Sequence, residues 1–254
     1  MRLTIKIGSN VLTRADGSLD VTRMSALVDQ IAELRNQGHE IILVSSGAVA
    51  SGRSELKHIQ HDLDSVDQRQ LFSAVGQAKL INRYFELFRE YGIAVGQVLT
   101  TKENFSDSEH RKNQENCMRV MLENNVLPIV NENDTVSVTE LMFTDNDELS
   151  GLIAQMTQSQ TLIILSNIDG IYTGAPSDPE SRLISIVKPG KDLSDYIQQS
   201  KSSAGRGGMQ SKSNVASQTA AAGISVLIAN GKRDNILVKL LNDRDNTPCT
   251  EFLC

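Results

Sequence analysis

The segment from Leu3 to Val44 decides the fold class. It reads LTIKIGSN at residues 3–10, VTRMSALVDQIAELRN at residues 21–36 and IILV at residues 41–44. The first and last runs are short and mainly apolar, as buried strands are, whereas apolar residues in the middle run recur at helical spacing. A strand, a helix and a second strand in this order predict a βαβ unit with parallel strands.

The same alternation continues to the end of the chain. Further strands are expected at Val95–Leu99, Val126–Val130, Thr161–Leu165 and Ile224–Ile228, with one more inside 182–187. Helices are expected at 65–91, through Met118 and Leu122, from Asp145, and from the 205–213 run to about Ala222. The expected buried face of the 65–91 helix consists of Leu71, Ala74, Val75, Ala78, Ile81, Phe85 and Phe88. This order predicts a three-layer α/β/α sandwich around a mostly parallel sheet.

Composition excludes several classes of protein. The chain has 254 residues and a net charge of −6, and 39% of its residues are hydrophobic, so it is globular and not a general binder of nucleic acid or anionic membranes. No apolar run is long enough to span a bilayer, and the N-terminus lacks a signal-peptide pattern. The three cysteines form no CxxC pair. We therefore expect a cytosolic protein with free thiols.

Small and polar residues follow four of the expected strands. The runs are Lys6–Asn10, Ser45–Ala48, Asn131–Asp134 and Ser166–Gly170. Because the carboxyl ends of parallel strands meet at one edge of a sheet, these loops should converge on one ligand. Exposed backbone N–H groups and helix N-termini attract anions, which favours a ligand with phosphate groups.

Two lysines stand beside such loops. Lys6 lies within an apolar strand and precedes Gly8, which indicates a lysine that faces a phosphate; the alternative is an edge strand with Lys6 in solvent. Lys212 follows Gly205, Gly207 and Gly208 near a helix start, where an anionic ligand would offset its charge; the alternative is a flexible glycine loop with a solvated lysine. The run matches neither the P-loop nor the dinucleotide-binding pattern.

Asp147 has two interpretations. It stands three residues after Thr144 at a helix start, so it could belong to a capping box instead of a catalytic centre. His58 and His61 have no further ligands nearby in sequence, and no metal site is predicted.

Taken in order, the loops resemble the amino acid kinase family. The matching runs are KIGSNVLT (6–13), VSSGAVASGR (44–53), AVGQAKL (74–80), YGIAVGQVLT (91–100), PIVNENDTV (128–136), TDNDELS (144–150), DGIYT (169–173) and GGMQSK (207–212). The resemblance covers nearly the whole chain, and the NEND and GGMQSK runs are typical of the members that phosphorylate the γ-carboxylate of glutamate. It implies the amino acid kinase fold in a single domain over residues 1–254, without the C-terminal PUA domain of many relatives.

The resemblance also implies roles for individual residues. Lys6 and Lys212 would contact the transferring phosphoryl group, and Asp147 would hold both lysines. Glutamate would bind to Ser46, Asp134 and Asn146. ATP would bind to Lys6, Gly8, Ser166, Asn167, Arg206, Gly207, Gly208, Met209, Gln210, Ser211 and Lys212. The family usually has Thr-Asp where this chain has Ser166-Asn167, so the contacts to the nucleotide can differ there.

The implied reaction is ATP- and Mg²⁺-dependent phosphorylation of L-glutamate to L-glutamyl 5-phosphate, which commits carbon to proline. Proline is the implied feedback inhibitor, with the residues from Ser137 to Thr144 expected to affect proline more than glutamate. A homo-oligomer, dimer or tetramer, is also implied. Two alternatives remain open: a relative acting on acetylglutamate, aspartate or a phosphate monoester, and a non-catalytic sensor of nucleotides or amino acids on the same fold.

Overall fold

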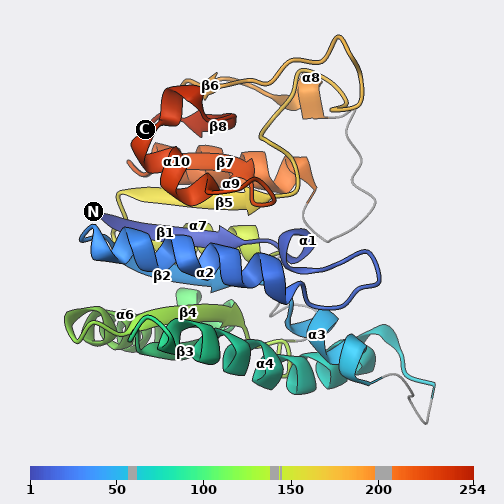
Figure 1. The fold of residues 1–254 in the computed structure, drawn as a ribbon, viewed down its shortest axis with the longest axis vertical. Helices are drawn as coiled ribbons and strands as arrows, with labels where there is room; N and C mark the ends of the chain where they lie inside the picture. Colours follow the sequence, from blue (N-terminus) through green and yellow to red (C-terminus); the bar gives the residue numbers. More distant parts are fainter. Residues whose placement is uncertain (57–61, 138–142, 144, 198–207) are drawn as a thin grey trace.

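The molecule is built around one mixed sheet, most of whose neighbouring strands are parallel. The computed structural model describes residues 1–56, 62–137, 143, 145–197 and 208–254. Within these residues an eight-stranded sheet has the order β3-β4-β2-β1-β5-β7-β8-β6, with helices on both of its faces (Figure 1). The predicted three-layer α/β/α sandwich is confirmed.

The strands begin and end close to the predicted positions. They are β1 (Arg2–Ile7), β2 (Glu40–Ser45), β3 (Val95–Thr100), β4 (Leu127–Glu132), β5 (Thr161–Ser166), β6 (Ile186–Val187), β7 (Ser225–Asn230) and β8 (Cys249–Phe252). All neighbours are parallel except β7 and β8. The sequence does not predict β8, because its four residues show no apolar run and are held in place by pairing with β7 and β6.

The helices connect these strands. They are α1 (Ser9–Leu12), α2 (Val21–Asn36), α3 (Ala48–Glu55), α4 (Ser65–Arg89), α5 (Glu103–Ser106), α6 (Ser108–Glu123), α7 (Asn146–Met156), α8 (Ser194–Ile197), α9 (Met209–Ala221) and α10 (Ile236–Asn242), followed by a 3₁₀ turn at Arg244–Asn246. The sequence does not predict α3 or α10, nor the four-residue helices α1, α5 and α8. Helix α3 is rich in small residues, and α10 is a short apolar run that reads equally well as a strand.

Both faces of the central strands are buried. On one face Ile5 and Leu43 pack in a cluster with residues of α2, α4 and α10. On the other face Ile42 packs in a cluster with residues of α6 and α7, and Ile164 packs in one with residues of α7 and α9. Because β1 lies between β2 and β5, Lys6 belongs to a central strand, and the alternative of a solvent-facing edge strand is wrong.

The buried face of α4 differs from the predicted one. Leu71 and Phe85 are 37% and 50% exposed, although Phe88 is buried as expected. The buried positions of α4 are Phe72, Ser73, Gly76, Leu80, Tyr84 and Phe88. The prediction followed the most apolar positions, whereas the packed face is the one on which small residues let another helix approach.

That close neighbour is α3. A Cβ atom built at Gly76 would lie 1.8 Å from the carbonyl oxygen of Ala48, and one at Gly52 would lie 1.8 Å from the carbonyl oxygen of Phe72. Both contacts are to backbone atoms, which no side-chain rotation can move. The two glycines therefore set the distance between α3 and α4, and α4 carries residues of the cavity described below.

We predict that Gly76→Ala lowers the free energy of unfolding by about 3 kcal/mol, since the added methyl group forces two helix backbones apart. Urea denaturation measures the change. Ala78→Ser, at an exposed position on the same helix, is the matched control and should stay within about 0.5 kcal/mol of the wild type. Equal stability of Gly76→Ala and the wild type would contradict the tight α3–α4 contact.

Candidate active site

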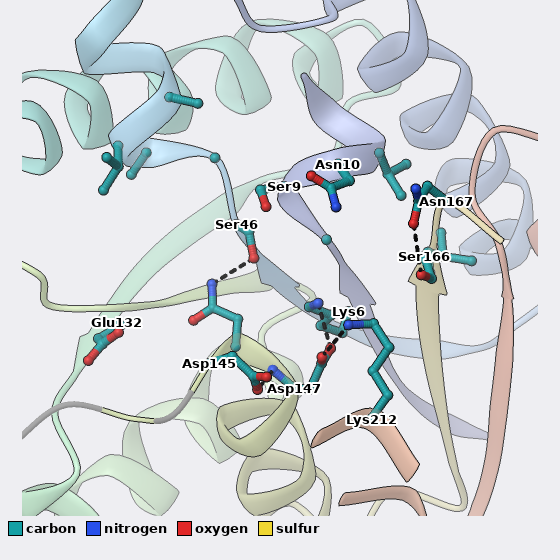
Figure 2. Close-up of a pocket in the computed structure, with 18 of the residues that line it drawn as sticks. Lys6, Ser9, Asn10, Ser46, Glu132, Asp145, Asp147, Ser166, Asn167 and Lys212 are labelled. Atoms are coloured by element: carbon teal, nitrogen blue, oxygen red, sulfur yellow. Dashed lines mark hydrogen bonds and ion pairs between the residues drawn. The ribbon is translucent and has the colours of Figure 1, made fainter. Parts of the chain in front are cut away.

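A cavity of about 890 Å³ opens at the carboxyl ends of β1, β2, β4 and β5. The polar loops predicted to converge there do converge (Figure 2). The lining includes Lys6, Gly8, Ser46, Asn131, Glu132, Asp134, Asp145, Asn146, Asp147, Ser166, Asn167, Met209 and Lys212. A single cavity thus contains residues from each of the four predicted loops.

Three charged side chains in the cavity lining pair with one another and form the charge centre of the site. The Lys6 ammonium of β1 lies 2.5 Å from Oδ1 of Asp147, and the Lys212 ammonium of α9 lies 2.9 Å from Oδ2 of the same carboxylate. Their side chains are 6%, 12% and 1% exposed for Lys6, Lys212 and Asp147. Lys212 is held in a helix by a buried partner, so the alternative of a solvated lysine is wrong.

Asp147 carries a negative charge in this centre. Burial alone would raise the pKa of its carboxyl group, but the ammonium groups of Lys6 and Lys212 outweigh burial and hold the pKa below the usual value of 3.8. Two ammonium groups therefore share one carboxylate. These three groups together carry a formal charge of +1 beside the cavity, which suits a phosphoryl group.

Asp145, not Asp147, caps helix α7. The Asp145 carboxylate accepts hydrogen bonds from the backbone N–H groups of Asp147 at 2.8 Å and Glu148 at 3.0 Å. Its other oxygen accepts a 2.6 Å hydrogen bond from the Ser211 hydroxyl. Asp145 thereby ties the start of α7 to the start of α9. The capping interpretation of Asp147 is wrong, and Thr144 lies outside the described residues.

The predicted nucleotide residues are only partly brought together. Met209 and Lys212 line the cavity. The Gln210 side chain is exposed, and its amide donates a hydrogen bond to the Asn214 side chain. Arg206 and Gly207 lie outside the described residues. Gly208 is the residue before α9, whose first turn reaches the cavity through Met209 and Lys212.

The loops that follow β1 and β5 also line the cavity. A Cβ atom at Gly8 would lie 3.3 Å from Nζ of Lys6 and 3.1 Å from the Leu165 carbonyl oxygen, so glycine leaves the ammonium room. Ser166 and Asn167 also line the cavity, and the Ser166 hydroxyl is 3.4 Å from Oδ1 of Asn167. Gly8 therefore leaves space beside the Lys6 ammonium, and Ser166 and Asn167 add polar groups to the cavity lining.

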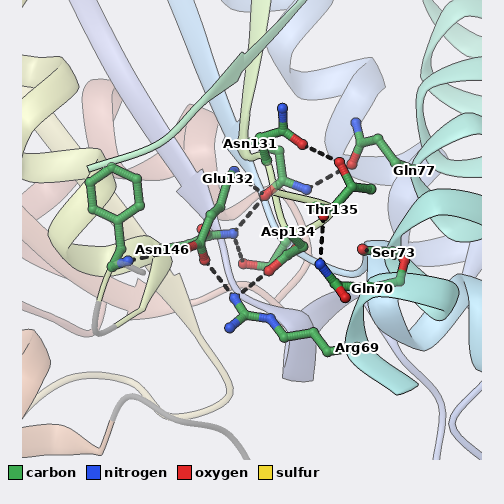
Figure 3. A network of polar contacts seen from close by, with 12 residues as sticks. Arg69, Gln70, Ser73, Gln77, Asn131, Glu132, Asp134, Thr135 and Asn146 are labelled. Atoms are coloured by element: carbon green, nitrogen blue, oxygen red, sulfur yellow. Dashed lines mark hydrogen bonds and ion pairs between the residues drawn. The ribbon is translucent and has the colours of Figure 1, made fainter. Parts of the chain in front are cut away.

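The opposite end of the cavity is a network of amides and carboxylates (Figure 3). The Asn146 amide donates to the Ser46 hydroxyl at 2.8 Å and to the Asn131 amide oxygen at 3.0 Å. Asp134 lies beside Glu132, and a single guanidinium group, that of Arg69, contacts both carboxylates. The predicted substrate residues Ser46, Asp134 and Asn146 therefore line one end of the cavity.

Among the cavity residues that sequence reasoning missed are Asp145, Glu132 and Arg69. Asp145 lies in the TDNDELS run and Glu132 in the PIVNENDTV run, both of which resemble the family. Their closeness in sequence to Asp147 and Asp134 is a signal that could have identified them. Arg69 lies in the polar stretch 53–70, which offered no motif that singled it out. It reaches Glu132 of β4 because it lies near the start of α4, and that packing cannot be read from the sequence.

Known proteins with similar sequences are kinases. The model of the amino acid kinase family matches residues 1–230. The chain belongs to the amino acid kinase family. It is 73% identical over 252 residues to the glutamate 5-kinase of Bacteroides thetaiotaomicron, covering 99% of this chain and 70% of that protein. It is 46% identical to the glutamate 5-kinase of Chlorobaculum tepidum, covering 93% and 65%. The chain thus spans about two thirds of the length of these relatives.

Solved structures of other kinases share the fold. An isopentenyl phosphate kinase matches with a TM-score of 0.68 at 16% identity, over 99% of this chain and 100% of that one. Carbamate kinase from Giardia lamblia, solved with AMP-PNP, matches with a TM-score of 0.68 at 16% identity, over 99% and 98%. At this identity the likeness confirms the amino acid kinase fold alone.

The described residues contain neither a cluster of metal ligands nor a membrane-spanning helix. Within them, no group of three or more His, Cys, Asp or Glu side chains is arranged to hold a metal ion. No described helix has the length and apolar character needed to cross a membrane.

We predict that Asp147→Asn lowers the free energy of unfolding by about 3 kcal/mol, because two buried ammonium groups lose their shared carboxylate. Asp145→Asn is the matched control, since asparagine also caps helices, and should cost less than about 1 kcal/mol. Thermal and urea denaturation of both variants measure the difference. If Asp145→Asn were the more damaging change, capping would outweigh the charge centre.

Proposed function

We propose that the protein transfers the γ-phosphoryl group of ATP to the γ-carboxylate of L-glutamate, producing L-glutamyl 5-phosphate for proline synthesis. The observation that carries the proposal is a single cavity with the Lys6–Asp147–Lys212 centre in it and the Ser46, Asp134 and Asn146 network at one end. The high identity to proteins named glutamate 5-kinase supports this choice of substrate.

The network end suits an amino acid. Asp134 offers a carboxylate to the α-ammonium group, while Ser46 and the Asn146 amide offer neutral hydrogen-bonding groups. Glutamate held there would extend its γ-carboxylate toward the lysines. This orientation places the attacking oxygen and the transferring phosphorus within one cavity, which lowers the entropic part of the barrier.

The lysine end suits phosphoryl transfer. The γ-carboxylate of glutamate is already ionised at neutral pH, so the reaction needs no general base. The difficulty is repulsion between this anion and the phosphates. Lys6 and Lys212, held by Asp147, supply positive charge where negative charge develops in the transition state.

Mg²⁺ would enter together with the nucleotide. In kinases it is commonly held by phosphate oxygens with only one or two carboxylates, and the Asp145 and Asp147 carboxylates in the cavity lining are donors of that kind. When bound, the ion would neutralise part of the negative charge of the phosphate groups. Asp147 retains the separate task of holding both lysines.

The proposed activity can be tested by trapping the acyl phosphate with hydroxylamine. We expect ATP- and Mg²⁺-dependent hydroxamate formation with L-glutamate, and little with acetylglutamate or aspartate. Lys6→Ala and Lys212→Ala should each lower kcat by about 10²-fold or more. Lys232→Ala, an exposed lysine after β7, is the control and should keep full activity. Preference for another acceptor would support a different family member, and no turnover with any acceptor would support the sensor alternative.

Proline is the proposed feedback inhibitor. It shares the α-carboxylate and charged nitrogen of glutamate but lacks a γ-carboxylate, so it could occupy the Asp134 end without accepting phosphate. We predict inhibition that excess glutamate relieves, measured as initial rates over a grid of both amino acids. Inhibition that glutamate cannot relieve would indicate a separate proline site. Most of the Ser137–Thr144 segment expected to tune this response lies outside the described residues.

A cytosolic location and a homo-oligomer, dimer or tetramer, complete the proposal. The first follows from the composition of the chain and the second from the family resemblance. Size-exclusion chromatography with light scattering measures the oligomer.

A further inference from the structure

Arg69 joins two acidic residues at the substrate end of the cavity. Its Nη2 atom lies 2.7 Å from Oε2 of Glu132 and also contacts the carboxylate of Asp134 (Figure 3). The three side chains are 12%, 5% and 10% exposed for Arg69, Glu132 and Asp134. Arg69 comes from α4, whereas the two acids come from β4 and the residues after it.

Glu132 is held from a second direction. Its Oε1 atom accepts a 3.1 Å hydrogen bond from the backbone N–H of Phe143, whose side chain is buried. Glu132 is thereby fixed between α4 and the segment that leads to α7. Because the Arg69 guanidinium group contacts both carboxylates, it also holds Asp134 in place relative to Glu132.

The charges within the triad of Arg69, Glu132 and Asp134 do not cancel. Two carboxylates and one guanidinium group give the triad a formal charge of −1 in a largely buried place, which attracts an ammonium group of a ligand. Without the guanidinium group, two adjacent buried carboxylates would repel each other, and Asp134 would lose a contact that holds it.

We propose that Arg69 is a positioning residue that sets both the orientation and the net charge of the ammonium-binding end. It holds Asp134 where the α-ammonium group of the substrate reaches it, and it keeps the triad at a charge that one ammonium group balances. The inference rests on the proposed function, since it assigns the ammonium group of an amino-acid substrate to Asp134.

Steady-state kinetics of Arg69→Gln, Glu132→Gln and the double variant test this role. In Arg69→Gln we expect KM for glutamate to rise about tenfold or more, with kcat within about threefold and KM for ATP unchanged. The double variant removes one charge of each sign and restores the formal charge of −1. Its new amide oxygen at position 132 can still accept the hydrogen bond from the Phe143 backbone. The double variant should therefore recover the part of the lost affinity for glutamate that the excess negative charge causes, but not the part that comes from the lost contact between Arg69 and Asp134.

Two further variants make the outcome decisive. Arg83→Gln, which removes a partly exposed arginine paired with Glu86 on the same helix, is the control and should match the wild type. If Arg69→Gln does not fold, Arg69→Lys keeps the charge but not the fork-shaped guanidinium group, and it should still raise KM for glutamate selectively.

The inference is overturned if the double variant is no better than Arg69→Gln, because the net charge of the triad then has no effect on the binding of glutamate. A fall in kcat with unchanged KM, in Arg69→Gln or in Arg69→Lys, also overturns it. Failure of the proposed function looks different, since the wild type and Arg83→Gln would then both lack activity on glutamate.

Discussion

The carboxylate of Asp147 binds two lysine ammonium groups that come from different elements, and the geometry of the site depends on this arrangement. Lys6 comes from the central strand β1, Lys212 from the first turns of α9, and Asp147 from the first turn of α7. None of the three charges could remain buried alone without a large cost. Their mutual pairing stabilises a positive centre in a largely buried place, and it brings three segments distant in sequence to one point.

The rest of the site is arranged around that centre. Asp145 and Ser211 form a second link between α7 and α9, so the two helix starts are joined at neighbouring residues. Gly151 of α7 adds to the fit: a Cβ atom there would lie 2.8 Å from Oγ1 of Thr219 in α9. At the other end, a guanidinium group from α4 holds two acids. The cavity therefore has a positive centre at one end and a negative triad at the other, as a zwitterionic acceptor of phosphate requires.

The sequence predicts the parts of this arrangement that have local signatures. The apolar runs locate most strands, and a lysine inside an apolar strand next to Gly8 correctly indicates a lysine at the cavity. The helix face of α4 and the role of Arg69 have no such signature. Which side of α4 is buried depends on the approach of α3 at Gly52 and Gly76, and the partners of Arg69 lie more than sixty residues away in the chain. Asp145 and Asp147 are equally good capping residues by sequence. Their roles are separated by the backbone N–H groups that donate to Asp145 and by the positions of Lys6 and Lys212 beside Asp147.

The most direct test of the account is a crystal structure with glutamate, Mg²⁺ and a non-hydrolysable ATP analogue. We predict that the ammonium groups of Lys6 and Lys212 lie within hydrogen-bond distance of the γ-phosphate group, with Asp147 still between them. We also predict the γ-carboxylate of glutamate in line with the bond to be broken and its ammonium group on Asp134. A γ-phosphate group bound away from both lysines, or glutamate bound in the reverse orientation, would contradict these predictions.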